Sequence, residues 1–210
     1  MVYNIIAYNM REYRVYMAKI DAKLLKNGLD WKEYLSSMTE NQGNFSKQIE
    51  IVKSKKDLHN PMKKLESKLE SKNFIILTED FCPDSLFNIP IFIIISELIS
   101  DLSLKIYRRS ENQYLNTICN NLNLMKIPAL LITDKSLKVL YKWEEKPKKA
   151  YKIQSDLLEK NKSLHENNND SNLTLKELMI NSLGNEYTNS LWSETISEID
   201  NITKVNSKLL

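Results

Sequence analysis

Cysteine is scarce in this chain, with two residues among 210. The N-terminal stretch, MVYNIIAYNMREYRVYMAK, lacks a basic leader, a clean apolar segment and a small-residue cleavage site, so it does not resemble a secretory signal. Two cysteines without an export signal indicate a reducing compartment, where a disulfide framework is not expected. We therefore expect a cytoplasmic protein.

Other features that would define a function class are also missing. His59 and His165 lie far apart in polar contexts with no third ligand in register, so we expect no metal and no cofactor. The net charge is only +3, and no RGG, zinc-ligand or RNP-like pattern is present, which argues against a nucleic-acid partner. The most apolar stretch, LFNIPIFIIISELI, has 14 residues, whereas a membrane span needs about 20, so no membrane partner is expected.

The hydrophobic content of 42% is enough for a real core. Periodicity separates three regions: a helical N-terminal extension over 1–72, an alternating core over 73–150, and C-terminal helices over 151–210 that pack on the core. The polar NNND segment, residues 167–170, interrupts the last region.

Several local signals place the helices. Asp30 with Glu33, and Thr174 with Glu177, have the spacing of a capping box at a helix start. Asn60-Pro61 predicts a break before a helix whose apolar residues recur at helical spacing, namely Met62, Leu65 and Leu69. Near the C-terminus, Trp192 and its apolar neighbours form a docking stripe, which also includes Leu191, Ile196 and Ile199.

The middle region alternates between strand and helix patterns. FIILT predicts a buried strand, a helix follows over about 84–100, LSLKIYR predicts the next strand and ENQYLNTICNNLN a second helix. IPALLIT and KVLYKW, joined by a DKSL turn, then predict two antiparallel strands. The order is β-α-β-α-β-β, followed by helix.

One cysteine occupies a distinctive place in this order. In TEDFCPDSLFNIP, residues 78–90, Cys82 ends the loop after the first strand, and Pro90 follows it by eight residues. Ile127-Pro128 precedes the third strand, 46 residues after Cys82. This element order and these two spacings resemble the thioredoxin fold, in which the nucleophilic cysteine caps a helix that a proline kinks, and a cis-proline precedes the third strand.

The chain also resembles an uncharacterised thioredoxin-like family of bacteria and archaea over roughly residues 28–200. The family's TEDWCGDA-like motif, N.P helix, IP dipeptide and WGPRP-like segment read here TEDFCPDSLFNIP, KIPALLITD and WEEKP. Its N-terminal and late helical patterns read GLDWKEYLSSM and SLWSE. The resemblance implies an α/β thioredoxin-like fold, a mixed sheet flanked by helices, with helical additions at both ends.

The chain departs from active thioredoxins at several positions. Ser85 replaces the second cysteine of C-x-x-C, Ile76 stands where thioredoxins keep a buried aspartate, and Phe81 replaces a tryptophan. Relative to the closer family, Lys146 replaces an arginine and Ser110 an acidic residue. A dithiol cycle with a neighbouring resolving thiol is therefore excluded.

A monothiol site remains chemically reasonable. Cys82 at a helix start lies where free N–H groups and the helix dipole favour a thiolate. Pro83 is tolerated in the first turn, and Ser85 is placed to donate a hydrogen bond to the sulfur. Asp84 opposes the thiolate if it points inward, and Glu79 and Asp80 add to the acidic rim. These effects together predict a modestly lowered pKa for Cys82.

Three further residues enter the predicted site or its surroundings. Pro128, if cis, turns the backbone of Ile127 toward the thiol, where it can pair with an extended substrate. Arg109, at a strand end, either holds a carboxylate of a small thiol or is a solvated surface charge. Cys119 lies on a helical apolar pattern and is expected in the core, with pairing to Cys82 as the alternative.

The leading hypothesis is monothiol thiol–disulfide exchange by Cys82 on mixed disulfides or oxidised protein thiols, with a low-molecular-weight thiol or a partner's cysteine resolving the intermediate. The alternative is a non-catalytic binding module in which Cys82 is a relic. A homodimer through the helical additions is also compatible with the sequence. Glutathione-transferase-like chemistry is disfavoured, because those enzymes have no helical segment of about 70 residues before the thioredoxin domain.

Overall fold

The computed structural model describes residues 18–167 and 174–204. At its centre lies a mixed four-stranded sheet in the order β2-β1-β3-β4. The first strand pairs in parallel with the second and antiparallel with the third, and the third pairs antiparallel with the fourth. The strands are β1 (Lys72–Thr78), β2 (Ser103–Arg108), β3 (Ala129–Asp134) and β4 (Val139–Glu144). The predicted order of strands and helices along residues 73–150 and the thioredoxin-like fold class are confirmed.

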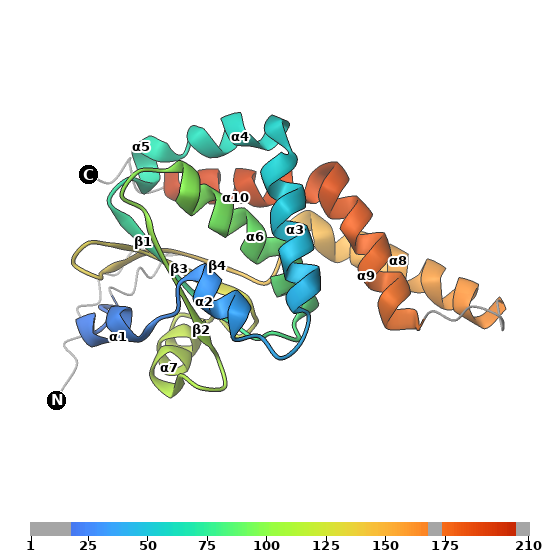
Figure 1. Ribbon diagram of the computed structural model, residues 1–210, viewed down its shortest axis with the longest axis horizontal. Coiled ribbons are helices and arrows are strands. Elements are labelled where there is room, and N and C mark those ends of the chain that lie inside the picture. Colours follow the sequence, from blue (N-terminus) through green and yellow to red (C-terminus); the bar gives the residue numbers. More distant parts are fainter. Residues whose placement is uncertain (1–17, 168–173, 205–210) are drawn as a thin grey trace, which may run out of the picture.

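Two helices of this core cover opposite faces of the sheet, α6 (Pro83–Leu98) on one side and α7 (Gln113–Asn121) on the other (Figure 1). Alternate residues of β1 serve the two faces: Phe74 and Ile76 join the α6 side, and Ile75 joins the α7 side. Because both faces are covered, the central residues of β1, 74–77, are all apolar instead of alternating with polar residues.

The remaining helices come from the two ends of the chain. The N-terminal ones are α1 (Ala22–Asn27), α2 (Trp31–Ser36), α3 (Gln42–Ser54), α4 (Lys56–Lys63) and α5 (Glu66–Leu69). The C-terminal ones are α8 (Lys148–Asn167), α9 (Leu175–Glu186), the π-helix η1 (Tyr187–Leu191) and α10 (Trp192–Lys204). Helices α3, α4 and α10 all contact α6, so both additions share its hydrophobic core.

Most of the local helix signals are confirmed. Both capping boxes are present, at Asp30–Glu33 and at Thr174–Glu177. Trp192 and the other residues of the predicted docking stripe are buried in the α6 core. The NNND segment falls largely outside the described residues, as do positions 1–17 of the predicted N-terminal helical region.

The structure corrects the N-terminal region in two places. Pro61 does not interrupt the helix but lies inside α4. The helix is instead bounded by Lys55 before it and Lys64 after it. Leu58 and Met62, one turn apart on α4, are both buried, so the packing of this face outweighs the hydrogen bond that proline removes. The region is also not purely helical, because Lys19 and Leu29 form isolated bridges to the edges of the sheet.

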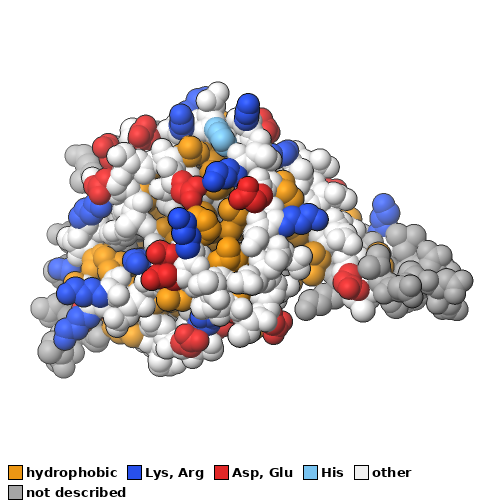
Figure 2. Space-filling model, in the orientation of Figure 1, with side chains coloured by type: hydrophobic (Ala, Val, Ile, Leu, Met, Phe, Trp, Pro, Cys, Tyr) orange, Lys and Arg blue, Asp and Glu red, His pale blue; other side chains and the backbone are white. Residues whose placement is uncertain are grey.

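The surface carries both charge signs. Figure 2 shows cationic and anionic side chains interspersed over one face, with apolar side chains visible near its middle. Within the described ranges, no helix combines the length and the hydropathy that a membrane crossing requires.

Candidate functional site

Cys82 is the N-cap residue of α6, and Pro83 occupies the first turn. The Cys82 carbonyl accepts the first intrahelical hydrogen bond, from the Leu86 N–H at 3.1 Å. The missing N–H of Pro83 costs nothing here, because an N–H in the first turn has no partner inside the helix. The end of β1 and the start of α6 therefore fix the position of the thiol.

The loop before β3 supplies the opposite wall of the site. The Ile127–Pro128 peptide bond is cis, as the resemblance to thioredoxins implied. The Cys82 Sγ donates a hydrogen bond to the Ile127 carbonyl oxygen, 3.5 Å away. Cys82 is only 7% exposed, so the thiol lies just below the surface and faces a backbone acceptor.

The electrostatics of Cys82 differ from the prediction. Burial raises the pKa of Cys82, and hydrogen bonds from Ser85 lower it but do not compensate. The Asp84 carboxylate raises the pKa further. Ser85 is itself fully buried, and its Oγ accepts a hydrogen bond from Thr78 Oγ1 at 2.6 Å. The predicted lowering was wrong because desolvation outweighs the helix start and the serine.

A buried ionic cluster adjoins the thiol. Lys146 Nζ lies 3.4 Å from Asp84 Oδ2 and 3.0 Å from Glu145 Oε1, and it stacks over the ring of Tyr151. Burial raises the pKa of Asp84, although the nearby Lys146 ammonium opposes the shift. Sequence reasoning noted Lys146 only as a replacement for an arginine and missed this cluster. The sequence signal for the cluster was the position of Lys146 directly after two glutamates in the WEEKP segment.

The predicted acidic rim is wrong for Glu79 and Asp80. Asp80 is buried and pairs with Arg108 at 3.1 Å, and it also accepts the Thr39 N–H. Glu79 is likewise buried and accepts the Ser110 N–H at 2.6 Å. Each carboxylate therefore binds a backbone N–H of another segment, Asp80 that of Thr39 and Glu79 that of Ser110.

Arg109 supports the loop opposite the thiol. Its guanidinium donates to Asn116 Oδ1 at 2.8 Å, to Asn120 Oδ1 at 3.1 Å and to the Met125 carbonyl at 2.9 Å. These contacts connect α7 to the segment that leads to Ile127. The carboxylate-binding role stays a prediction, and the contacts favour a positioning role.

A buried hydrogen-bond network centred on Asn88 of α6 was also not predicted from the sequence. The Asn88 side-chain amide donates to the Tyr187 hydroxyl, the Glu145 carbonyl and the Asp84 carbonyl, at 2.9, 3.2 and 2.9 Å. Thr195 Oγ1 donates back to Asn88 Oδ1 at 3.0 Å. The asparagine of the N.P pattern was the one visible sign of it. The network attaches the C-terminal helices to the helix that begins at the thiol.

The second cysteine lies elsewhere. Cys119 is a free, fully buried residue of α7 and packs with Leu115 and Leu131, on the face of the sheet opposite α6. Burial raises its pKa to about 11. The core assignment is confirmed, and Cys82 and Cys119 are both free thiols in the structure. In the part of the chain that the structure describes, no group of three or more His, Cys, Asp or Glu side chains could hold a metal ion.

A mixed sheet with a cysteine at the start of α6, facing the carbonyl before a cis-proline, defines the thioredoxin-like class of proteins. A family model described as Thioredoxin matches residues 28–161, and the chain belongs to this family. No protein of curated function matches the sequence significantly.

Two solved structures share the fold over almost their whole length. A protein of unknown function from Pseudomonas aeruginosa is 16% identical with a TM-score of 0.62, covering 90% of this chain and 98% of its own. An HIV epitope scaffold is 15% identical with a TM-score of 0.59, covering 87% and 96%. At these identities the similarity shows the fold alone.

Proposed function

We propose that this protein carries out thiol–disulfide exchange by a monothiol mechanism in a reducing, cytoplasmic compartment. The observation that carries the proposal is the contact between Cys82 Sγ and the Ile127 carbonyl at 3.5 Å. It supports attack on a disulfide held in extended form against the loop before β3, with backbone hydrogen bonds as in strand addition.

The exchange has two balanced steps. The Cys82 thiolate attacks one sulfur of a disulfide, a new bond forms between the two sulfurs, and the other sulfur leaves with the electron pair and takes up a proton. Since Ser85 has no sulfur, a second, external thiol then attacks the mixed disulfide and releases Cys82. Each cycle consumes one external thiol: one half of the substrate disulfide leaves as a free thiol, and the other half leaves in a disulfide with the external thiol.

The raised pKa of Cys82 sets the rate of this chemistry. Few molecules carry the thiolate near neutral pH, so exchange is slow there and accelerates as the pH rises. A more basic thiolate is also more nucleophilic, which recovers part of the loss. We therefore propose a slow exchange enzyme with a protonated resting thiol.

The burial of Cys82 and its raised pKa also favour the second candidate, a non-catalytic binding module. The two are separated by incubating the Cys119→Ala variant with glutathione disulfide under native conditions and following the mass. The exchange enzyme forms a glutathione adduct that added thiol removes, and Cys82→Ser abolishes it. A protein that forms the adduct only in denaturant contradicts catalysis and leaves the binding module.

A further inference from the structure

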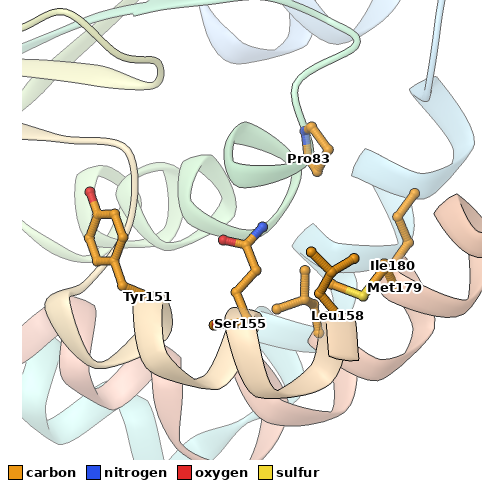
Figure 3. A pocket seen from close by; sticks show the side chains of 8 residues that line it. Pro83, Tyr151, Ser155, Leu158, Met179 and Ile180 are labelled. Atoms are coloured by element: carbon orange, nitrogen blue, oxygen red, sulfur yellow. The ribbon is translucent and has the colours of Figure 1, made fainter. Parts of the chain in front are cut away.

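A cavity of about 460 Å³ borders the residue after the thiol (Figure 3). It lies between α8 and α9, two helices of the C-terminal addition, and Pro83 at the start of α6 closes one side. Most of the lining is apolar and comes from Pro83, Tyr151, Leu158, Met179, Ile180 and Leu183. A volume in this range accommodates a small molecule or a few side chains.

Exposed apolar side chains gather around the thiol. Among the described residues, the large hydrophobic side chains that are strongly exposed are Phe81, Met125, Tyr151 and Leu158. Phe81, 55% exposed, directly precedes Cys82, and Met125, 65% exposed, lies two residues before Ile127. The other two line the cavity. An apolar surface concentrated at one place on a protein indicates an interaction site.

Two of the three polar side chains that line the cavity, Tyr151 and Gln154 but not Ser155, have hydrogen-bond partners among the residues that the structure describes. The Gln154 side chain accepts a hydrogen bond from Lys146, and the Tyr151 hydroxyl donates to the Glu145 carboxylate. The Gln154 side-chain oxygen and the Tyr151 hydroxyl proton therefore already have partners in the protein. The walls offer mainly apolar contact to an occupant.

The cations around the thiol are engaged as well. Lys146 pairs with Asp84 and Glu145, and Lys126 also pairs with Glu145. Arg109 donates to side chains of α7 and to the backbone before Ile127. A small thiol such as glutathione would bring carboxylates to cations that already have partners, whereas an apolar side chain needs none of them. The apolar lining of the cavity therefore favours an uncharged, apolar occupant.

We propose that the cavity is a subsite for a bulky apolar side chain next to the cysteine of an oxidised polypeptide. The inference rests on the proposed exchange function and identifies its substrate class. Docking of the side chain between α8 and α9 presents the polypeptide sulfur to Cys82. Attack forms the Cys82–polypeptide disulfide, and the thiol that was bonded to the polypeptide leaves with the electron pair and a proton.

Two peptides test this subsite. Both carry a cysteine in mixed disulfide with thionitrobenzoate, and they differ only in having Leu or Ser beside it. With the Cys119→Ala protein, release of thionitrobenzoate is expected to be at least about tenfold faster for the Leu peptide, because burial of a leucine side chain is favourable. Leu158→Asn should remove most of this preference. Asp156→Asn, which introduces the same residue at an exposed position of α8 outside the lining, should keep it.

The outcomes separate the two proposals. Equal rates for both peptides, with normal reaction of Cys82 toward the small reagent dithiobis(nitrobenzoate), overturn the subsite alone. No reaction of Cys82 with any of the three disulfides in the folded protein overturns the exchange function and the subsite together. A dimer that Leu158→Asn dissociates would assign the cavity to a second copy of the chain and would also overturn the subsite.

Discussion

The side-chain amide of Asn88 donates a hydrogen bond to the hydroxyl of Tyr187 over 2.9 Å, although 99 residues separate them in the sequence. Both side chains are almost fully buried, one on the helix that starts at the thiol and one on the π-helix of the C-terminal addition. This bond, together with the contact of Asn88 to Thr195, makes the C-terminal helices part of the support of the site.

Asn88→Ala is expected to lower the free energy of unfolding by about 3 kcal/mol. The substitution removes the amide that donates to the buried Tyr187 hydroxyl and to the Glu145 carbonyl, so both lose this hydrogen bond. Tyr187→Phe removes one hydroxyl and should cost only about 1 kcal/mol. Urea denaturation measures both losses, provided that the dependence of the unfolding free energy on urea concentration is the same in all variants. Equal losses in the two variants would contradict a central role for Asn88.

The rate of Cys82 alkylation in the Cys119→Ala protein should rise with pH to a midpoint above the free-cysteine value of about 8.5. The sign follows from the raised pKa: the folded protein keeps the proton on Cys82 at pH values where a free thiol has lost it. Iodoacetamide labelling across the pH range, followed by mass spectrometry, gives the midpoint. A midpoint well below that of a free thiol would show that Ser85 and the helix start prevail over burial.

Asp84→Asn should accelerate alkylation of Cys82 severalfold near neutral pH, since it removes a negative charge that raises the thiol pKa. Glu79→Gln is the matched control, because the Glu79 carboxylate is engaged by the Ser110 N–H. The midpoint of the pH profile should fall in the first variant and stay unchanged in the second. Equal shifts in both would assign the effect to the overall negative charge of the loop.

Arg109→Gln should slow the reaction of Cys82 with a neutral and with an anionic small disulfide by a similar factor, because Arg109 positions the loop before Ile127. The comparison uses hydroxyethyl disulfide and glutathione disulfide. A selective loss for glutathione disulfide would instead establish the carboxylate-binding role predicted from the sequence.

The sequence predicted the parts of the site whose signals are local. A thiol between a buried strand and a helix, with Pro83 in the first turn, follows from residue type and order alone. The loop at Ile127-Pro128 followed from its spacing to Cys82 and the resemblance to thioredoxins. Each of these is a property of a short segment, and each appears in the structure where it was expected.

The electrostatics of the site could not be predicted in the same way. The pKa of Cys82 depends on how completely the sulfur is removed from water, which the loop before β3 decides from 45 residues away. The same holds for Lys146, whose side chain reaches Asp84 across 62 positions. Local sequence patterns carry no information on such distant approaches.

The sequence by itself determined the strands, the helices, the order that defines the fold, and the place of Cys82 at a helix start, because hydrophobic periodicity, capping residues and prolines act within a few residues. Only the tertiary structure decided that Pro61 stays inside a helix, that Asp80 pairs with Arg108, and that the C-terminal helices form an apolar cavity beside Pro83. Those outcomes depend on burial and on pairing between distant segments, which arise only when the chain packs.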